Sequence, residues 1–220
     1  MPDTTTVADC MAIVERYNLL PRFPASVRAL FERGQLEETP KHNDAAFEDS
    51  HYLSILSNAT AIDAAVESAA MGGFAVEVDN SCDDWDFQRA ADHLLARLRQ
   101  FRRGVSRACL ISGGEVTVQV EGTSGVGGRN QQFALYCAQK IAGENITVLS
   151  AGTDGIDGNS QAAGGLVDGS TTERARQHGL DVATALANFD AFPLLEAIGD
   201  AVITGPTGNN VRDLRILLAY

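Results

Sequence analysis

A strand followed at once by a glycine-rich loop is visible in Ile146-Thr147-Val148-Leu149-Ser150-Ala151-Gly152-Thr153-Asp154-Gly155-Ile156-Asp157-Gly158. The run from Ile146 to Ala151 is mostly apolar and of strand length, which is typical of a buried strand. Glycine and aspartate then alternate through Gly158, and these residue types favour turns. In open α/β sheets, ligands gather where such loops follow strands. We therefore expect a buried strand whose following loop belongs to a functional site.

Outward from this stretch, strand-like and helix-like patterns alternate along the chain. Further strands are predicted at Tyr52–Leu56, Phe74–Val78, Ala108–Ile111, Val116–Val120, Ala201–Thr204 and Leu214–Leu218. Helices are predicted from Asn58 or Thr60 through Ala70, over Asp84–Arg103, Gln131–Ile141 and Thr171–Gly179, and in short pieces around Val182 and Phe192. This alternation predicts an α/β layered sandwich with a largely parallel or mixed sheet flanked by helices, in which residues 108–120 can form a hairpin.

The N-terminal part of the chain has a different pattern. Thr6 can cap a first amphipathic helix, and a second helix is expected around Pro24. Residues 36–49 have no periodicity and indicate a connecting loop. We therefore expect a helical segment at residues 1–48 and an α/β domain at residues 49–220.

Composition and charge narrow the function. The 220 residues are 45% hydrophobic and carry a formal net charge of -12, so the long-range field repels nucleic acid and anionic lipid. The apolar runs are far shorter than the roughly 20 residues of a membrane span. Residues 1–6 contain no basic leader or apolar stretch that would resemble a secretory signal. We expect a cytoplasmic protein with no nucleic-acid or membrane partner.

Cysteine, histidine and lysine are sparse. The four cysteines and four histidines are scattered without metal-ligand spacing, so ordinary reduced thiols are expected. Lys41 and Lys140 are the only lysines. A phosphate bound by this chain would therefore depend mainly on arginine and on backbone N–H groups.

The first of three glycine-rich constellations combines residues 112–115 with residues 122–131. Glycines let backbone N–H groups approach an anion, the next helix presents its positive N-terminus, and Arg129 can make a bidentate contact with phosphate or carboxylate. The glycine spacing matches neither a Walker A loop nor the dinucleotide fingerprint. An anion cradle and a flexible loop with a solvated arginine explain the pattern equally well.

The other two constellations follow strands. Asp154 and Asp157 can hold Mg²⁺, and Asp168 can join them, although acidic residues beside glycine more often form Asx turns. Residues 204–210, Thr-Gly-Pro-Thr-Gly-Asn-Asn, offer hydroxyl and amide groups to a small hydroxy acid or a nucleotide phosphate. A simple Pro-Gly turn is the alternative for this third loop.

Residues 112–115, 127–131, 150–158 and 204–208 resemble, in this order, the signature segments of the MOFRL domain of glycerate 2-kinases, a family also called hydroxypyruvate reductase. The resemblance is strongest over residues 108–220, and Ser57-Asn58 resembles part of the family's middle region. Two positions depart from it: Gln132 replaces a common acidic residue, and Asn209 replaces a common Thr. Family members are also longer, with an N-terminal glycine-rich segment and a lysine thought to serve the active site. Residues 1–48 would be a remnant of the preceding domain.

The resemblance implies the C-terminal portion of an ATP-dependent kinase that phosphorylates D-glycerate at its 2-hydroxyl, with ATP and Mg²⁺. Arg129, Asp154 and Asp157 would be catalytic, and the two aspartates would hold the metal. The residues expected to bind substrate or phosphate are Ser112, Gly113, Gly114, Glu115, Gly127, Gly128, Asn130, Thr153, Thr204, Thr207 and Asn210.

Two alternatives remain open at this point. The chain can be a catalytically silent fragment or subunit that needs an N-terminal partner, since neither lysine resembles a replacement for the family's lysine. It can also be a hydroxypyruvate reductase using NAD(P)H, although the dinucleotide fingerprint is incomplete. Glycerate, an N-terminal half or subunit, and a second copy of the chain are the partners considered.

Overall fold

The computed structural model describes residues 2–120, 122 and 125–220. The chain divides into two compact units, Met1–Ile55 and Leu56–Tyr220. Within the described ranges, no helix combines the length and the apolar content that crossing a membrane requires.

The smaller unit contains α1 (Val7–Arg16), α2 (Ala25–Glu32) and two 3-10 turns, η1 (Leu20–Arg22) and η2 (Ala45–Phe47). Thr6 caps α1 as predicted, and Asp9 completes a reciprocal capping box with it. Among the described residues of this unit, Val14 is the only buried hydrophobic one. The unit therefore has almost no core of its own.

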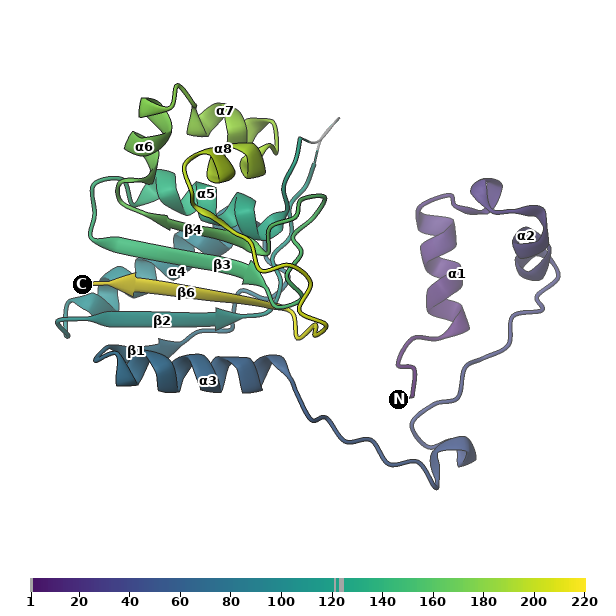
Figure 1. Cartoon of the computed structure of the whole chain (residues 1–220). Helices are drawn as coiled ribbons and strands as arrows, with labels where there is room; N and C mark the ends of the chain where they lie inside the picture. The colour runs from purple at the N-terminus through teal and green to yellow at the C-terminus, as the bar shows by residue number, and fades with distance from the viewer. Residues whose placement is uncertain (1, 121, 123–124) are drawn as a thin grey trace. The chain divides into compact units, whose positions relative to one another are not determined.

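The larger unit is built on a six-stranded sheet with the order β1-β2-β6-β3-β4-β5 (Figure 1). Its strands are β1 (Ala75–Val78), β2 (Ala108–Gly113), β3 (Ile146–Gly152), β4 (Gly164–Asp168), β5 (Ala201–Val202) and β6 (Asp213–Ala219). Only β1 and β2 pair in parallel, and the other neighbours are antiparallel. Of the two sheet types predicted, the sheet is the mixed one.

Helices cover both faces of this sheet, which confirms the predicted α/β layers. The helix α3 (Asn58–Met71) packs on one face near β1 and β2 (Figure 1), while α5 (Arg129–Lys140) and α8 (Ala191–Ala197) pack on the other face. The remaining helices are α4 (Phe87–Arg102), α6 (Thr171–Gln177) and α7 (Val182–Ala187).

The alternation of side chains along β2 divides the core into two clusters. Ala108 and Leu110 belong to the larger cluster, which contains Leu94 of α4 and Phe133 of α5. Cys109 and Ile111 point to the other face and pack with α3. Fully burying one such leucine or phenylalanine contributes about 1.5–3 kcal/mol.

Two predicted strands are wrong. Residues Tyr52–Leu56 form no strand, and Leu53 and Ile55 are 81% and 86% exposed. Residues Val116–Val120 form only an isolated parallel bridge, between Thr117 and Asp86. The hairpin cannot form because β1 and β6 already occupy both edges of β2.

Strand β4 was not predicted, because its first residues, Gly164 and Gly165, are typical of a loop. The backbones of β3 and β4 approach so closely there that a Cβ on Gly164 would lie 1.9 Å from the Ser150 carbonyl oxygen. Asp168 ends β4 opposite Thr147, at the far end of β3 from Asp154. The expectation that Asp168 joins a metal site with Asp154 is therefore wrong.

Candidate active site

The candidate site lies at the sheet edge where β2 and β3 end and β6 begins. Because β6 is inserted between β2 and β3 and runs opposite to both, Gly113 pairs with Leu214 and Gly152 pairs with Asp213 at this edge. The loops that follow β2 and β3 therefore meet the segment that precedes β6. This arrangement brings the three predicted glycine-rich constellations together.

Arg129, the first residue of α5, forms the centre of the ion-pair network at this edge. Its Nε and Nη2 donate to the two carboxylate oxygens of Asp213 at 2.7 and 3.1 Å. Its Nη2 also lies 3.0 Å from Oε1 of Glu115. The hydrogen bonds to Asp213 are the main reason that the pKa of Arg129 is raised. Hydrogen bonds among the described residues leave Nη1 of Arg129 without an acceptor, so this nitrogen can donate to a ligand.

Asp157 caps the N-terminus of α5 from the loop after β3. Its Oδ1 accepts from N and Nδ2 of Asn130 at 3.1 and 3.3 Å. Its Oδ2 accepts from N and Nε2 of Gln131 at 2.9 and 3.0 Å. Burial raises the pKa of Asp157, and the N–H donors of Gln131 and Asn130 oppose that shift. The carboxylate thus occupies the helix end that was predicted to receive a ligand anion.

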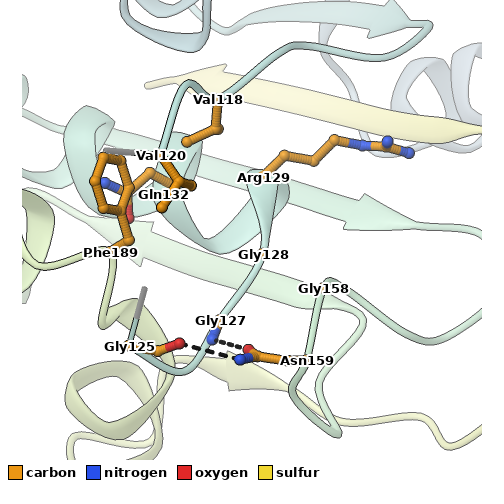
Figure 2. A pocket seen from close by; sticks show the side chains of 10 residues that line it. All are labelled: Val118, Val120, Gly125, Gly127, Gly128, Arg129, Gln132, Gly158, Asn159 and Phe189. Atoms are coloured by element: carbon orange, nitrogen blue, oxygen red, sulfur yellow. Dashed lines mark hydrogen bonds between the residues drawn. The ribbon is translucent and has the colours of Figure 1, made fainter. Parts of the chain in front are cut away.

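Gly128 is required by this cap. A Cβ at Gly128 would lie 2.4 Å from both the backbone carbon and the carboxyl carbon of Asp157. Asn159 holds the preceding residues, since Gly127 N donates to its Oδ1 at 2.8 Å and its Nδ2 donates to Gly125 O at 3.0 Å (Figure 2). The N–H groups of Gly128 and Arg129 have no acceptor among the described residues. Thr123 and Ser124 of the predicted cradle lie outside the described residues.

The third loop packs directly on the second. Thr207 donates from Oγ1 to Thr153 O at 2.6 Å, and its N–H donates to Asp154 O at 3.0 Å. Oγ1 of Thr153 donates to Arg212 O at 2.7 Å. These contacts place Thr207 and Thr153 in structural roles. Among the described residues, Oγ1 of Thr204 donates only to the carbonyl oxygen of Gly205 in its own loop, so no bond fixes this hydroxyl to the loop after β3.

Asp154 is more available than Asp157. Its Oδ1 accepts from Ile156 N at 3.1 Å, as in an Asx turn, and its Oδ2 lies 3.5 Å from Nδ2 of Asn210. Described acidic, histidine and cysteine side chains form no group of three that could hold a metal ion. Mg²⁺ commonly binds one or two carboxylates and completes its shell with phosphates and water. Asp154 fits that pattern, whereas all lone pairs of Asp157 already face donors.

Side chains from residues 79–86 hold the end of β2 and the loop that follows it. Gly113 N donates to Oδ1 of Asn80 at 2.8 Å, and Glu115 N donates to Oδ1 of Asp83 at 2.9 Å. Asp83 also receives two hydrogen bonds from Arg212, at 2.8 and 2.6 Å. Asn80, Asp83 and Arg212 were not predicted, because none of them lies in a glycine-rich loop after a strand.

Arg215 is a fully buried arginine directly beneath the site. Its Nη2 donates to Gly113 O and Gly114 O at 3.1 and 2.9 Å and so fixes the turn after β2. Burial lowers the pKa of Arg215. Its Nε and Nη1 have no partner among the described atoms, and the same holds for Oγ of Ser112. Ser112 is a buried residue of β2, so its hydroxyl is not exposed in the predicted substrate loop.

Asp213 and Arg215 are also site residues that the sequence analysis does not predict. The signal that could have revealed them is the placement of two charged residues at alternate positions of an otherwise apolar strand, Asp213–Ala219. Such residues point to one face and need partners there. That face is the one on which α5 and the loop after β2 lie.

Two cavities adjoin at this site, and Val118, Arg129 and Gly158 line both of them. The first, of about 260 Å³, is bordered by Val118, Val120 and Phe189 (Figure 2). The second, of about 610 Å³, is lined by polar groups that include Thr117, Arg129 and Asp154. In Figure 2 the guanidinium of Arg129 points away from Phe189. An apolar compartment and a polar one thus meet at Arg129.

Comparisons with known proteins agree with the resemblance seen in the sequence. Residues 108–213 match the MOFRL family. The glycerate 2-kinase of Pyrococcus horikoshii is 34% identical, over 98% of this chain and 50% of its own length. The D-glycerate 2-kinase of Thermotoga maritima is 35% identical, again over 98% of this chain and 50% of its own length.

The fold is shared as well. A crystal structure of glycerate kinase from Thermotoga maritima matches this chain with a TM-score of 0.78 at 36% sequence identity, covering 100% of this chain and 51% of that one. The chain spans about half the length of these relatives. It therefore belongs to the MOFRL family, as a homologue of the C-terminal portion of glycerate 2-kinases.

Proposed function

We propose that this chain provides the C-terminal portion of an ATP-dependent glycerate 2-kinase, which transfers the γ-phosphoryl group of ATP to the 2-hydroxyl of D-glycerate. One observation carries the proposal: in a homologue of these kinases, Arg129 and Asp154 line the same polar cavity at one sheet edge. A cation and a carboxylate in one cavity can hold an anionic hydroxy acid and accept a proton from it.

Each of the two side chains has a distinct role in this proposal. Asp213 and Glu115 fix the orientation of Arg129, and its Nη1 then donates to the carboxylate of glycerate or to a phosphate. Asp154 accepts the proton of the 2-hydroxyl as the oxygen of that hydroxyl bonds to the γ-phosphorus. The bond between this phosphorus and the oxygen that bridges to the β-phosphate breaks, and ADP leaves. Mg²⁺, when bound at Asp154, would neutralise charge on the phosphates.

The charges at this edge also favour a divided site. Three arginines, Arg129, Arg212 and Arg215, are accompanied by five carboxylates, from Asp83, Glu115, Asp154, Asp157 and Asp213. Glycerate and ATP are both anions, so this edge alone repels its substrates. We infer that Mg²⁺ and a cationic side chain from an N-terminal part are required, and that the isolated chain is catalytically silent.

The test is a coupled assay for ADP release with D-glycerate, ATP and Mg²⁺. The 220-residue chain is assayed alone and together with the N-terminal half of the Thermotoga maritima relative. Activity only in the mixture supports a divided site, and activity of the chain alone overturns the silent-fragment inference. If neither preparation releases ADP, the kinase proposal is wrong. Oxidation of NAD(P)H with hydroxypyruvate in the same mixture would support the reductase alternative.

Arg129→Lys separates the role of this residue from general effects of charge. Lysine keeps the positive charge but cannot bond Asp213 bidentately and still donate to a ligand. We expect ADP release to fall at least about a hundredfold, about 2.7 kcal/mol in activation free energy. Arg176→Lys is the matched control, because the Arg176 side chain is 75% exposed and, among the described residues, pairs only with Glu173 on α6. Full activity of Arg129→Lys would remove Arg129 from the mechanism.

A further inference from the structure

The apolar cavity beside Arg129 contacts neither glycerate nor the phosphates in the proposed reaction. Val118 and Val120 form one part of its wall and Phe189 another, and the backbone of Gly125, Gly127 and Gly128 completes it (Figure 2). Glycerate is a three-carbon molecule with a polar group on every carbon, and it offers no apolar surface to these side chains. The base of a nucleotide, in contrast, is a flat ring with two apolar faces and a polar edge.

The walls of this cavity are fixed by hydrogen bonds that connect distant parts of the chain. Val126 N donates to Oδ1 of Asp190 at 2.7 Å, and Gly125 N donates to Asn188 O at 3.0 Å. Phe192 N donates to Val126 O at 2.9 Å. The glycine-rich segment and the segment that carries Phe189 are therefore held together before any ligand binds. Such preorganisation lowers the entropy that ligand binding must overcome.

Gln132 provides a polar group in the lining of the same cavity. Gln132 is 3% exposed. Its Nε2 donates to Leu186 O at 2.8 Å, which fixes the orientation of the amide. No described residue donates to its Oε1. Because the bond at Nε2 fixes the amide and Gln132 lines the cavity, Oε1 is an oriented acceptor of the kind that the exocyclic amine of a purine can satisfy.

The neighbouring groups continue toward the polar compartment. The N–H groups of Gly128 and Arg129 have no acceptor among the described residues; both residues line the apolar cavity, and Arg129 also lines the polar one. A phosphate chain that leaves the apolar cavity would pass these donors before it reaches the polar cavity of Arg129 and Asp154. We propose that the cavity between Val118, Val120 and Phe189 binds the base of the nucleotide, with the triphosphate extending over Gly128 toward Asp154. This inference rests on the proposed kinase function, and it assigns the nucleotide to the segment of residues 125–132.

The test measures binding to the full 220-residue chain by titration calorimetry in the presence of MgCl₂. The probes are ATP, adenosine and inorganic tripolyphosphate. We expect Phe189→Ala to weaken ATP and adenosine at least about tenfold and to leave tripolyphosphate unchanged. Val118→Ala should act in the same direction with a smaller effect. Leu166→Ala, which alters an exposed leucine of β4 outside the cavity, is the matched control and should change nothing.

The outcomes separate the two proposals. Unchanged tripolyphosphate binding also shows that Phe189→Ala is folded. If Phe189→Ala does not fold, Val118→Ala provides the same test. If both variants bind ATP like the unaltered chain, or lose ATP and tripolyphosphate equally, the base site is wrong, whatever the kinase assay gives. If ATP binding depends on Phe189 but the complemented assay releases no ADP, the base site stands and the kinase proposal falls. If the chain does not bind adenosine, which is uncharged and is not repelled by the carboxylates of this edge, the base site is wrong.

Discussion

Asp154 and Asp157 lie three residues apart in one loop, and we expect alanine to affect them in opposite ways. Asp157→Ala removes the acceptor of four N–H groups, two of them at the backbone of the first turn of α5, from a residue that is 3% exposed. Losing a helix N-cap costs about 0.5–2 kcal/mol. Each buried donor left unpaired costs about 1–3 kcal/mol.

These costs do not add fully. Burial raises the pKa of Asp157, because burying the ionised carboxylate costs free energy. Asp157→Ala removes that carboxylate, so this cost is absent in the variant. We therefore expect the free energy of unfolding to fall by about 2–4 kcal/mol. For a chain of this length, the midpoint of thermal unfolding should fall by roughly 4–16 °C.

Asp154→Ala should leave stability almost unchanged and remove activity. Its carboxylate accepts one hydrogen bond at 3.1 Å and has one longer contact at 3.5 Å, so we expect a loss below about 1 kcal/mol. Urea unfolding followed by circular dichroism measures both variants at pH 7, and the complemented ADP assay measures turnover. The division of roles is refuted if Asp157→Ala unfolds within about 0.5 kcal/mol of the unaltered chain, or if Asp154→Ala is the less stable variant.

Three further perturbations test other parts of the larger unit and the thiols. Burial raises the pKa of Asp79, but hydrogen bonds from Ser81 outweigh it and lower the value to about 2 from 3.8. The stabilisation from this depressed pKa is present above pH 3.8 and is lost as pH falls toward 2, so Asp79→Asn should cost about 2 kcal/mol at pH 7 and flatten urea stability over that window. Gly128→Ala should weaken tripolyphosphate binding and lower stability by about 1–3 kcal/mol, because its Cβ would overlap Asp157, whereas Gly104→Ala, with its nearest atom at 3.8 Å, should do neither. Cys10 is the exposed thiol and burial raises the pKa of Cys109 to about 11, so a thiol reagent should label the folded chain at Cys10 alone, as peptide mass spectrometry would show.

Much of the fold could be predicted from local patterns. β3 is readable because its apolar run ends abruptly in glycine and aspartate, and α4 because its apolar residues follow helical spacing. Residues 116–120 alternate like a strand, but alternation cannot reveal that both edges of β2 are already occupied. β4 begins with two glycines because β3 approaches it closely, and no local pattern distinguishes that need from the need of a turn.

The candidate site was predictable only in its loops. Arg129 and Asp154 stand out because each lies in a glycine-rich segment next to an apolar run. Asp213 stands at the start of the last strand and has no such context. Its role arises because β6 inserts between β2 and β3, which brings residues more than eighty positions apart, Arg129 and Asp213, into a bidentate pair. Pairing of this kind depends on strand order, which a single sequence does not encode locally.

That strand order also determines how the site can receive an anion. Asp213 is 2% exposed on its side chain and bonds two nitrogens of Arg129, so displacing it would leave a buried carboxylate without a partner. Glu115 is 32% exposed and makes a single contact with the same guanidinium, so water can solvate it when it moves. A ligand anion that accepts from Nη1 of Arg129 would therefore repel Glu115 toward water and leave Asp213 in place. Arg129 acts in this view as a donor already held in position, and the remaining excess of carboxylates explains why substrate binding would need cations from outside this chain.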